Sequence, residues 1–301
     1  MIDRDALTLL PTFLAVAETS SFTAAAARLG QSPSAVSQSI RALEQKIKHP
    51  LFRRTTRSVS LTEQGEALLR RAGPAMRELG LAIEMAAGAS GKPSGLLRLN
   101  VPRIAMPMVL EPALPLMRQR YPDLAIEIYV EDAAVDIVEQ GFDAGIRIGN
   151  MTSPDVISVN VTGPLIAMLV AAPAYIARRG TPKSIADLNA HDCIGFRLSG
   201  SKRLYAWELV DGKRDIQFAP PPSVIVNDTI FTLTLTLSGF GIGYMFDKLA
   251  RPYLDDGTLV QVLPKAALKE PPLTLYFPRY ANDQPKLRAL IDTLREVMKR
   301  R

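Results

Sequence analysis

The sequence predicts an α/β protein that begins with an all-α helix-turn-helix unit and a small two-stranded wing. The chain opens with three short amphipathic segments that are separated by helix-capping residues and a glycine. From residue 95 onward, strand-like and helix-like segments alternate in two similar sets, an order typical of parallel sheets covered by helices. A strongly basic segment, residues 41–57, lies between these two parts of the chain.

Composition limits the function classes. The 301 residues suffice for two or three domains, and 47% hydrophobic with 22% charged residues is typical of an ordinary globular protein. Residues 41–57 contain six basic side chains against Glu44 alone, a net charge of +5 in a chain of net charge +6. A charge run is usually a solvated surface, but its position after a two-faced helix favours phosphate contact. An aromatic share of 6% argues against stacking platforms for single-stranded nucleic acid.

The first two helices follow from apolar spacing and from capping residues. The first helix is predicted by an apolar stripe formed by Leu7, Leu10, Phe13, Leu14 and Ala17. Ser21 caps a second helix, Phe22 to Leu29, and Gly30 ends it. A helix, a short turn and a second helix are the helix-turn-helix pattern.

The third helix has two different faces. Its apolar stripe is formed by Val36, Ile40, Leu43 and Ile47, and its polar stripe by Ser34, Ser37, Gln38 and Arg41. Ser32 is placed to cap this helix, and Pro33 suits its first position. A helix that buries one face and exposes short polar groups with an arginine is suited to reading base edges in a major groove.

A wing and a long helix should come next. Leu51 and Phe52 are apolar anchors, and Arg53 to Ser60 has the composition of two short strands. Thr62 is placed to cap a helix with an a/d seam suited to pairing or to packing on its own domain; the seam comprises Leu69, Ala72, Met76, Leu79, Ile83 and Ala86. Pro74 should kink or interrupt this helix. Residues 88–95, GASGKPSG, are a linker by composition.

The remaining chain supplies strands and helices. We expect strands at 96–101, 124–130, 144–149, 164–172 and 193–197, and helices at 104–120, 134–140, 174–180 and 285–299. Residues 229–237, TIFTLTLTL, alternate like a strand. The flanking Asp228 and Ser238-Gly239 favour a helix there instead.

The residues resemble the LysR-type transcriptional regulators over the whole chain. The specific match is FLAVAETSSFTAAAARLGQSPSAVSQSIRALEQKIKHPLFRRTTRSVSLTEQG, and weaker matches, YPDLAIEI, GFDAGIRIG, NAHDCIGFR and SGFGIGY, follow in the expected order. The resemblance implies a winged helix-turn-helix at 1–60, a dimerising linker helix at 61–88 and a hinge at 89–94. It also implies a two-lobed, periplasmic-binding-protein-like (type 2) effector domain at 95–301, with lobe I at 95–163 and 266–301 and lobe II at 164–265. The implied partners are double-stranded DNA, a small-molecule effector between the lobes, and further copies of the chain in a dimer or tetramer.

The resemblance also implies which residues contact DNA. Pro33 and Ser34 lie where the family's recognition helix begins, and Ser37, Gln38 and Arg41 lie on its exposed face. Arg53 and Arg54 stand at the wing entrance, where the family contacts phosphates. Many relatives carry arginine where this chain has Gln38. Glutamine reads adenine edges but supplies neither the bidentate guanine contact nor the charge of arginine.

Candidate effector contacts follow from the fold type. Ligands of open α/β folds bind beyond the carboxyl ends of strands, where helix N-termini present N–H groups. The candidates by this rule are Pro102, Arg103, Asp132, Arg147, Gly149, Arg197 and Asp228. Each of them is individually also compatible with a surface or hinge role. The three arginines favour a carboxylate-bearing metabolite.

The sequence offers little support for a catalytic or metal site. His191, Asp192 and Cys193 are adjacent, whereas triad members normally meet from separate segments. Gly239, Gly241 and Gly243 follow an expected helix, which is the wrong order for a dinucleotide site. Two histidines and one cysteine leave little material for a zinc site, and no cofactor is predicted.

The expected setting is a reducing cytoplasm, because a single cysteine excludes an intrachain disulfide. The sequence shows neither a signal peptide nor an apolar stretch long enough to cross a bilayer, so no membrane partner is expected. The remaining alternative is a cytoplasmic small-molecule receptor or enzyme whose N-terminal helices serve only in assembly. The larger share of the chain, from Gly95 to Arg301, motivates it.

Overall fold

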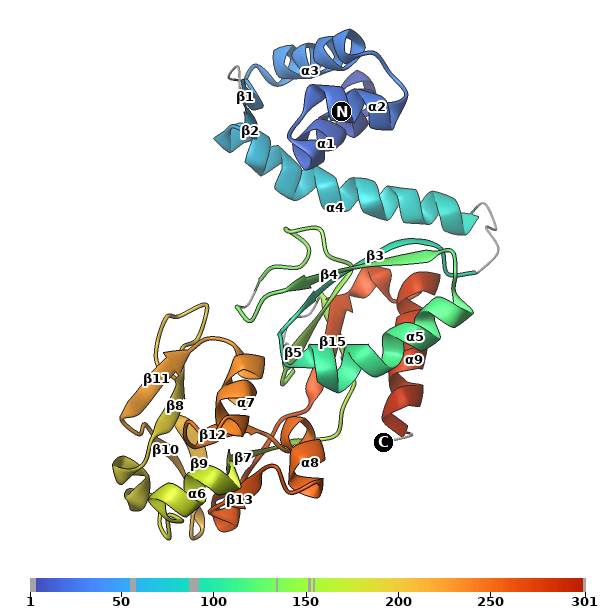
Figure 1. Ribbon diagram of the computed structural model, residues 1–301. Coiled ribbons are helices and arrows are strands. Elements are labelled where there is room, and N and C mark those ends of the chain that lie inside the picture. The colour runs from blue at the N-terminus through green and yellow to red at the C-terminus, as the bar shows by residue number, and fades with distance from the viewer. Residues whose placement is uncertain are drawn as a thin grey trace. The chain divides into compact units, whose positions relative to one another are not determined.

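The computed structural model describes residues 4–54, 58–86, 92–133, 135–150, 153 and 155–299 (Figure 1). The chain forms two compact units, each described here by itself. The first comprises residues 1–90 with 138–141, and the second comprises the remaining residues. Arg57 of the predicted wing, Ala134, and residues 87–91 of the predicted linker region lie outside the described residues. In the part of the chain that is described, no helix is both long and apolar enough to cross a membrane.

The first unit is a helical domain with a wing. Its elements are α1 (Arg4–Thr19), α2 (Phe22–Leu29), α3 (Pro33–Ile47), β1 (Phe52–Arg54), β2 (Val59–Leu61) and α4 (Glu63–Ala86). Phe13 and Val16 of α1 are fully buried with Val36 and Ile40 of α3, which confirms the predicted apolar face of the third helix. Leu7 is largely exposed, so the predicted stripe of the first helix begins too early.

Capping residues set the boundaries of the helix-turn-helix as predicted. The Ser21 hydroxyl accepts a hydrogen bond from the Ala24 N–H at 3.2 Å, and the Ser32 hydroxyl accepts one from the Ala35 N–H at 3.2 Å. Gly30 ends α2 at a φ of +63°, a left-handed conformation that costs glycine little.

Residue 65 fixes the junction between the wing and α4. Thr62 caps α4, because its hydroxyl accepts the Gly65 N–H at 3.1 Å and donates to the Pro50 carbonyl at 2.7 Å. A Cβ atom at residue 65 would lie 2.2 Å from the Leu51 carbonyl oxygen, so this close approach requires glycine. The helix begins at Glu63, two residues after the predicted start of the linker.

The helix α4 continues through Pro74, so the predicted interruption is wrong (Figure 1). A proline inside a helix removes one i→i−4 hydrogen bond, and the turns on both sides of it retain theirs. Leu69 packs against the core of the first unit, whereas Leu79 and Ile83 are 55% and 68% exposed. The far part of the predicted seam is therefore an uncovered apolar surface.

The second unit contains two α/β lobes. The first lobe has a five-stranded sheet of order β4-β3-β5-β15-β6, formed by β3 (Gly95–Val101), β4 (Leu124–Val130), β5 (Ala144–Ile148), β6 (Val156–Asn160) and β15 (Leu273–Pro278). The strand β3 is parallel to β4 and β5, whereas β15 is antiparallel to β5 and β6, so the sheet is mixed rather than purely parallel.

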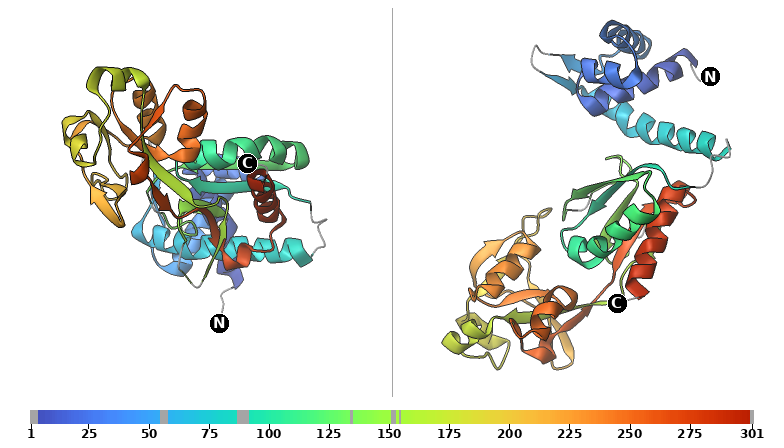
Figure 2. Two further views of the ribbon diagram at one scale, coloured as in Figure 1. Left: turned by 90° about the horizontal axis from the view of Figure 1, so that it is seen from below. Right: turned by 45° about the vertical axis from the view of Figure 1, so that its right-hand side comes forward.

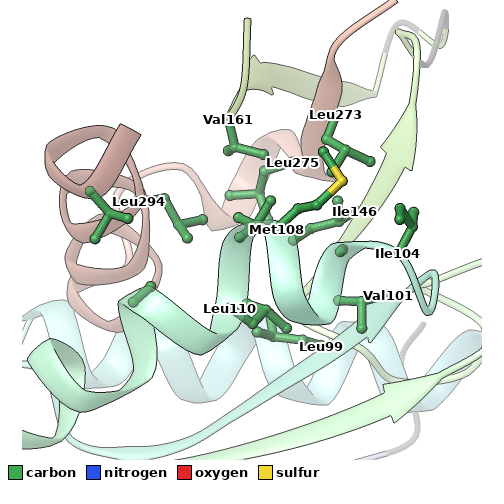
Figure 3. Close-up of a cluster of buried hydrophobic side chains, with 14 of the residues drawn as sticks. Leu99, Val101, Ile104, Met108, Leu110, Ile146, Val161, Leu273, Leu275 and Leu294 are labelled. Carbon is green, nitrogen blue, oxygen red and sulfur yellow. The ribbon is translucent and has the colours of Figure 1, made fainter. Parts of the chain in front are cut away.

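Helices cover the first lobe's sheet. A π-helical segment (Met106–Leu110) leads directly into α5 (Glu111–Arg120), and α9 (Pro285–Lys299) packs beside α5 (Figures 1 and 2). Side chains of the sheet and of the π-helical segment meet in an apolar core that includes Leu99, Met108 and Leu275 (Figure 3). The helices predicted at 104–120 and 285–299 are thus confirmed, apart from the first residue or two. A short 3₁₀ helix (Arg279–Ala281) follows β15.

The second lobe is built around β7. It contains β7 (Leu165–Ala171), β8 (Cys193–Phe196), β9 (Trp207–Asp211), β10 (Arg214–Phe218), β11 (Pro222–Val226), β12 (Gly243–Phe246), β13 (Val260–Val262) and β14 (Leu268–Glu270). Its helices are α6 (Pro173–Arg179), α7 (Thr229–Leu237), α8 (Asp247–Asp255) and two 3₁₀ helices (Ala186–Ala190, Pro264–Ala266). The β7 sheet is antiparallel throughout, so the expectation of parallel sheets is wrong for it. The strands β8 and β11 pair in parallel, and Cys193 of β8 forms a parallel bridge with Ile242.

Two further expectations need correction, one element was not predicted, and one expectation is confirmed. Residues 137–141 form turns where a helix was expected at 134–140, because hydrogen bonds from the Gly141 N–H to the Val138 carbonyl and from the Phe142 N–H to the Ile137 carbonyl close the segment. The return to the first lobe comes after Glu270, not at residue 266, since β14 pairs with β7. The β9–β10 hairpin was not predicted. The segment 229–237 is a helix, as its flanking residues indicated.

Candidate functional site

The polar face of α3 is accessible. Ser34, Gln38 and Arg41 are exposed, as is Pro33 at the first turn, and Ser37 is half-buried. The opposite face holds the buried Val36, Ile40 and Leu43. One helix therefore anchors itself in the core and presents hydroxyl, amide and guanidinium groups outward, which are the groups that pair with base edges and phosphates.

Arg54 connects the wing to this face. Its guanidinium lies over the Phe22 ring, 4.1 Å from the centroid, and its Nη1 donates to the Ser37 hydroxyl at 3.1 Å. The Phe22 ring in turn packs edge-on against Phe52, which is buried at the base of the wing. Arg53 pairs with Ser60 through the backbone of the wing. Its side chain is exposed and has no hydrogen bond or ion pair among the described residues. The two arginines that sequence reasoning treated alike thus differ in their contacts.

The one acid of the basic segment has a structural role. Glu44 accepts hydrogen bonds from the Leu51 N–H at 2.8 Å and the Phe52 N–H at 3.3 Å, so its carboxylate fixes the start of the wing. Glu44 is half-buried, whereas the exposed charged side chains of α3 and β1 are the cations Arg41, Lys46, Arg53 and Arg54. A cationic surface of this kind attracts the phosphate backbone.

The second unit holds a cavity of about 320 Å³ between its lobes. Both lobes contribute to its walls. The lining residues are Pro102, Ile104, Asp132, Arg147 and Ile148 from the first lobe, and Ile194, Phe196, Leu198, Tyr205, Trp207, Thr229, Thr232, Tyr244, Met245 and Phe246 from the second. The lining is mainly aliphatic and aromatic, which is usual for a small-molecule site with a few orienting polar groups.

The predicted effector residues separate into three groups. Pro102, Asp132 and Arg147 line the cavity. Arg103 and Asp228 form an ion pair across the lobes at 2.9 Å, and they line a neighbouring polar hollow of about 330 Å³. This hollow also shares Asp132, whose Oδ1 accepts the Arg103 N–H at 2.8 Å.

The other two candidates lie apart from the cavity walls. Arg197 lines a smaller hollow of about 140 Å³ and donates to the Lys202 carbonyl at 2.8 Å. Gly149 adopts a φ of +79° and donates its N–H to the Pro272 carbonyl at 2.9 Å. Its position is therefore that of a turn residue beside the crossover between the lobes.

Arg147 is held by its surroundings. Its Nη1 donates to the Glu131 carbonyl at 3.0 Å, and its Nη2 donates to Asn100 Oδ1 at 3.0 Å and to the Ala133 carbonyl. These bonds tie the end of β5 to the loop after β4. The guanidinium is therefore a fixed part of the wall, with most of its donors already used.

Sequence reasoning missed the aromatic wall of the cavity. Trp207, Tyr205 and Tyr244 come from the unpredicted hairpin region and from β12. A single tryptophan in 301 residues is the signal that could have drawn attention to this segment. Thr229 and Thr232 lie in the first turn of the helix that Asp228 caps, so the rule that selected the capping residue reached the correct helix end but omitted its first turn.

His191, Asp192 and Cys193 are each held by contacts within the second lobe. Cys193 is fully buried, and burial raises the pKa of its thiol to about 12, which keeps it protonated and unreactive. The His191 Nδ1 lies 3.0 Å from the Tyr175 hydroxyl, whereas the Cys193 thiol donates to the Leu188 carbonyl at 3.6 Å, so the two side chains have different partners. Among the described residues, no cluster of three acid, histidine or cysteine side chains could hold a metal ion.

Comparison with protein families decides the identity of both units. Residues 7–66 match the bacterial regulatory helix-turn-helix protein model of the lysR family, and residues 90–299 match the LysR substrate binding domain. The chain belongs to the LysR family of transcriptional regulators. It is a DNA-binding regulator that responds to a small molecule, which sets aside the alternative of an enzyme with assembly helices.

Individual relatives agree with this family. The chain is 38% identical over 281 residues to the uncharacterized HTH-type transcriptional regulator YcaN of Escherichia coli K12, an alignment spanning 93% of this chain and 92% of that protein. It is 32% identical over 294 residues to the regulator PgrR of the same organism, spanning 97% and 98%. A solved structure of CrgA, a LysR-type transcriptional regulator from Neisseria meningitidis, is similar with a TM-score of 0.63 and 27% identity over 99% of both chains.

Proposed function

We propose that α3 reads a specific operator through Ser34, Ser37, Gln38 and Arg41, with Pro33 starting the helix against the DNA backbone. The observation that carries the proposal is the separation of the helix into a buried apolar face and an exposed polar face. Recognition helices of this type place their N-terminal residues against base edges. Gln38 is suited to an adenine, and Arg41 to a guanine or a phosphate.

The wing arginines have separate parts in this proposal. Arg53 is exposed and uncommitted among the described residues, so it is suited to contact a phosphate directly. Arg54 is held against Phe22 and Ser37, so it sets the angle between wing and recognition helix and offers its remaining N–H groups to the backbone. Both contacts would be independent of sequence.

The helix α4 would provide the contact between copies of the chain, and the interlobe cavity would provide the response to the effector. The exposed Leu79 and Ile83 on α4 would pair with the same residues of a second copy, giving a dimer or a tetramer with two or more recognition helices. An effector in the interlobe cavity would favour one arrangement of the lobes and so shift the population of DNA-competent assemblies. Because the chain would act on chromosomal DNA and has one buried cysteine, we place it in the cytoplasm.

The proposal also concerns the chemical class of the effector. The expectation of a carboxylate rests on Arg103, Arg147 and Arg197. In the structure, Arg103 pairs with Asp228, Arg147 is held by carbonyl groups, and Arg197 lies outside the cavity. A carboxylate would therefore have to be a substituent of the effector that reaches Arg147, and the main body of the effector would meet an apolar lining.

An operator-binding assay tests the proposal. The full-length protein is titrated onto labelled DNA from its own upstream region and onto an unrelated duplex, at two salt concentrations. Arg41→Ala should lower affinity for the upstream DNA by about ten- to a hundredfold. Its affinity for unrelated DNA should fall less. Equal affinity of wild type and variant for the upstream DNA would refute the assignment of α3.

A further inference from the structure

The interlobe cavity has the volume of a compact ring system. Apolar cavities of about 150 Å³ accept one benzene ring, and this cavity measures about 320 Å³. It therefore has room for two fused rings, or for one ring with a substituent. Ligand sites usually start near this size, so the cavity suits a small effector and would be filled by it.

Part of the wall is made of ordered aromatic rings. Trp207 and Tyr244 stack with their centroids 5.8 Å apart and an interplanar angle of 11°, and Tyr205 lies 6.0 Å from Tyr244. The Tyr244 hydroxyl donates to the Glu208 carbonyl at 3.0 Å, which fixes the ring. Such rings favour further aromatic partners in offset or edge-to-face contact at similar distances.

The charged side chains of the lining already have hydrogen-bond partners within the protein. Arg147 donates to two carbonyl groups and to Asn100, and Asp132 accepts the Arg103 N–H. Arg147 is the cation among the described lining residues. A small aliphatic dicarboxylate would exchange its water for mainly apolar groups, and its second charge would have no cationic partner in the lining.

We infer that the effector of this chain is an aromatic molecule of one or two rings, whose uncharged ring system enters the cavity. Its single polar substituent hydrogen-bonds to Thr229, Thr232 or Asp132. The Thr232 hydroxyl already donates to the Asp228 carbonyl at 3.1 Å, so it offers lone pairs to a donor on the ligand. An alcohol or amide substituent therefore fits better than a charged one. This inference rests on the function proposed above, because it specifies the ligand of that cavity.

Trp207 provides the readout, since it lines the cavity and is the one tryptophan of the chain. Benzyl alcohol, 1-naphthalenemethanol, their saturated counterparts cyclohexylmethanol and decahydronaphthalene-1-methanol, and succinate are titrated into the full-length protein. Calorimetry measures affinity, and Trp207 fluorescence reports occupancy for the probes that do not emit. The aromatic alcohols should bind about two- to tenfold more tightly than their saturated counterparts, and succinate should not displace them.

Two matched variants locate the binding. Ile148 lines the cavity and is 43% exposed, whereas Ile166 lies on β7, is 40% exposed and is not among the cavity's lining residues. Ile148→Asn should weaken 1-naphthalenemethanol about tenfold, and Ile166→Asn should leave its affinity unchanged. Since both side chains are well exposed, neither substitution removes a core residue. Equal affinities of the two variants would overturn the inference.

The remaining outcomes are decisive in the same way. The inference is overturned if succinate binds more tightly than the aromatic alcohols, if the saturated alcohols bind as tightly as the aromatic ones, or if no aromatic probe binds. Upstream DNA binding is measured on the same preparation. Retained DNA binding with failed ligand binding removes only the ligand class, whereas lost DNA binding removes the proposed function itself.

Discussion

The polar face of α3 and the interlobe cavity, the two binding sites proposed above, differ in their physical character. The α3 face comes from a single helix, is exposed, and adjoins a cationic wing. The cavity is assembled from segments between residues 102 and 246, and its walls are mainly apolar. Affinity at the first surface should depend strongly on salt, because binding releases counterions from DNA. Affinity at the second should depend on buried apolar area and respond little to salt.

The two regions also depend on different supports. The wing is held to α4 by a backbone approach at Gly65, and the α3 face is held to the wing by Arg54. The cavity is held by its two cores and by contacts between lobes. Damage to one region should therefore leave the other intact.

The largest effect is expected at Gly65. A Cβ atom there would meet the Leu51 carbonyl oxygen at 2.2 Å, so Gly65→Ala must move the wing away from α4. We expect a loss of about 2 kcal/mol or more in the stability of the first unit, with loss of DNA binding. Calorimetric melting and operator binding measure these effects. Ligand binding at the interlobe cavity should be unchanged.

Gly80 supplies the matched control for Gly65. It lies in the same helix, and nothing lies within 4 Å of the position its Cβ would occupy. Gly80→Ala should therefore raise helix stability by about 0.5–1 kcal/mol. If both alanine variants behaved alike, the close approach at Gly65 would not be what fixes the wing.

The wing arginines should separate charge from positioning. Arg53→Ala should lower affinity similarly for all duplexes and reduce the salt slope by about one. Arg54→Ala should do the same and also lower the melting temperature, because it removes the contacts with Phe22 and Ser37. Salt-dependent binding curves and thermal melting distinguish the two variants. Identical melting temperatures would show that the Arg54 contacts do not stabilise the wing.

The difference between the regions also explains what the sequence could predict. The α3 face depends on spacing within fifteen residues, with Ser32 at its start, so periodicity and capping rules sufficed. The long helix and α7 were likewise identified from local patterns. Pro74 shows the limit of local rules, since one missing hydrogen bond did not end a helix that the remaining turns maintain.

The cavity depends on tertiary pairing that no local pattern reports. Trp207 and Tyr244 stack although 37 residues separate them, because β9 and β12 both pack near β7. The rule that ligands bind beyond the carboxyl ends of strands found Pro102 and Asp132, which follow β3 and β4, and Arg147, which lies near the end of β5. It also selected Arg197 and Gly149, which are not among the lining residues. Arg197, directly after β8, donates to the Lys202 carbonyl, and Gly149 lies in the turn after β5.

A pH effect on stability is expected in the second lobe. Burial, with a hydrogen bond to Glu208 and repulsion from it, raises the pKa of Glu270 to about 7. A carboxyl whose pKa is higher in the folded state than in the unfolded state binds more protons when folded. The stability of this lobe should fall as the pH rises from about 4.5 to about 7 and should level off above that. Glu270→Gln should flatten this dependence in thermal melting, and an unchanged slope in the variant would contradict the assignment.

The smallest effect is expected for the ion pair that links the lobes. Arg103 Nε lies 2.9 Å from Asp228 Oδ2, but both side chains are partly exposed, so the coupling energy should be about 0.2–1 kcal/mol. Asp228 also caps α7 through the N–H groups of Ile230 and Phe231, which makes Asp228→Asn the appropriate partner variant because asparagine still caps. A double-mutant cycle with Arg103→Ala isolates the pair.

The same cycle, repeated with ligand bound, relates this pair to the regulatory mechanism. If closure around the ligand brings the lobes together, Arg103 and Asp228 should couple more strongly in the bound state than in the free state, because the ion pair is then less exposed to water. Equal coupling in both states would mean that the ligand fills the cavity without changing the distance between the lobes at this point. The effector signal would then have to leave the second unit by another route, through the core that the two lobes share.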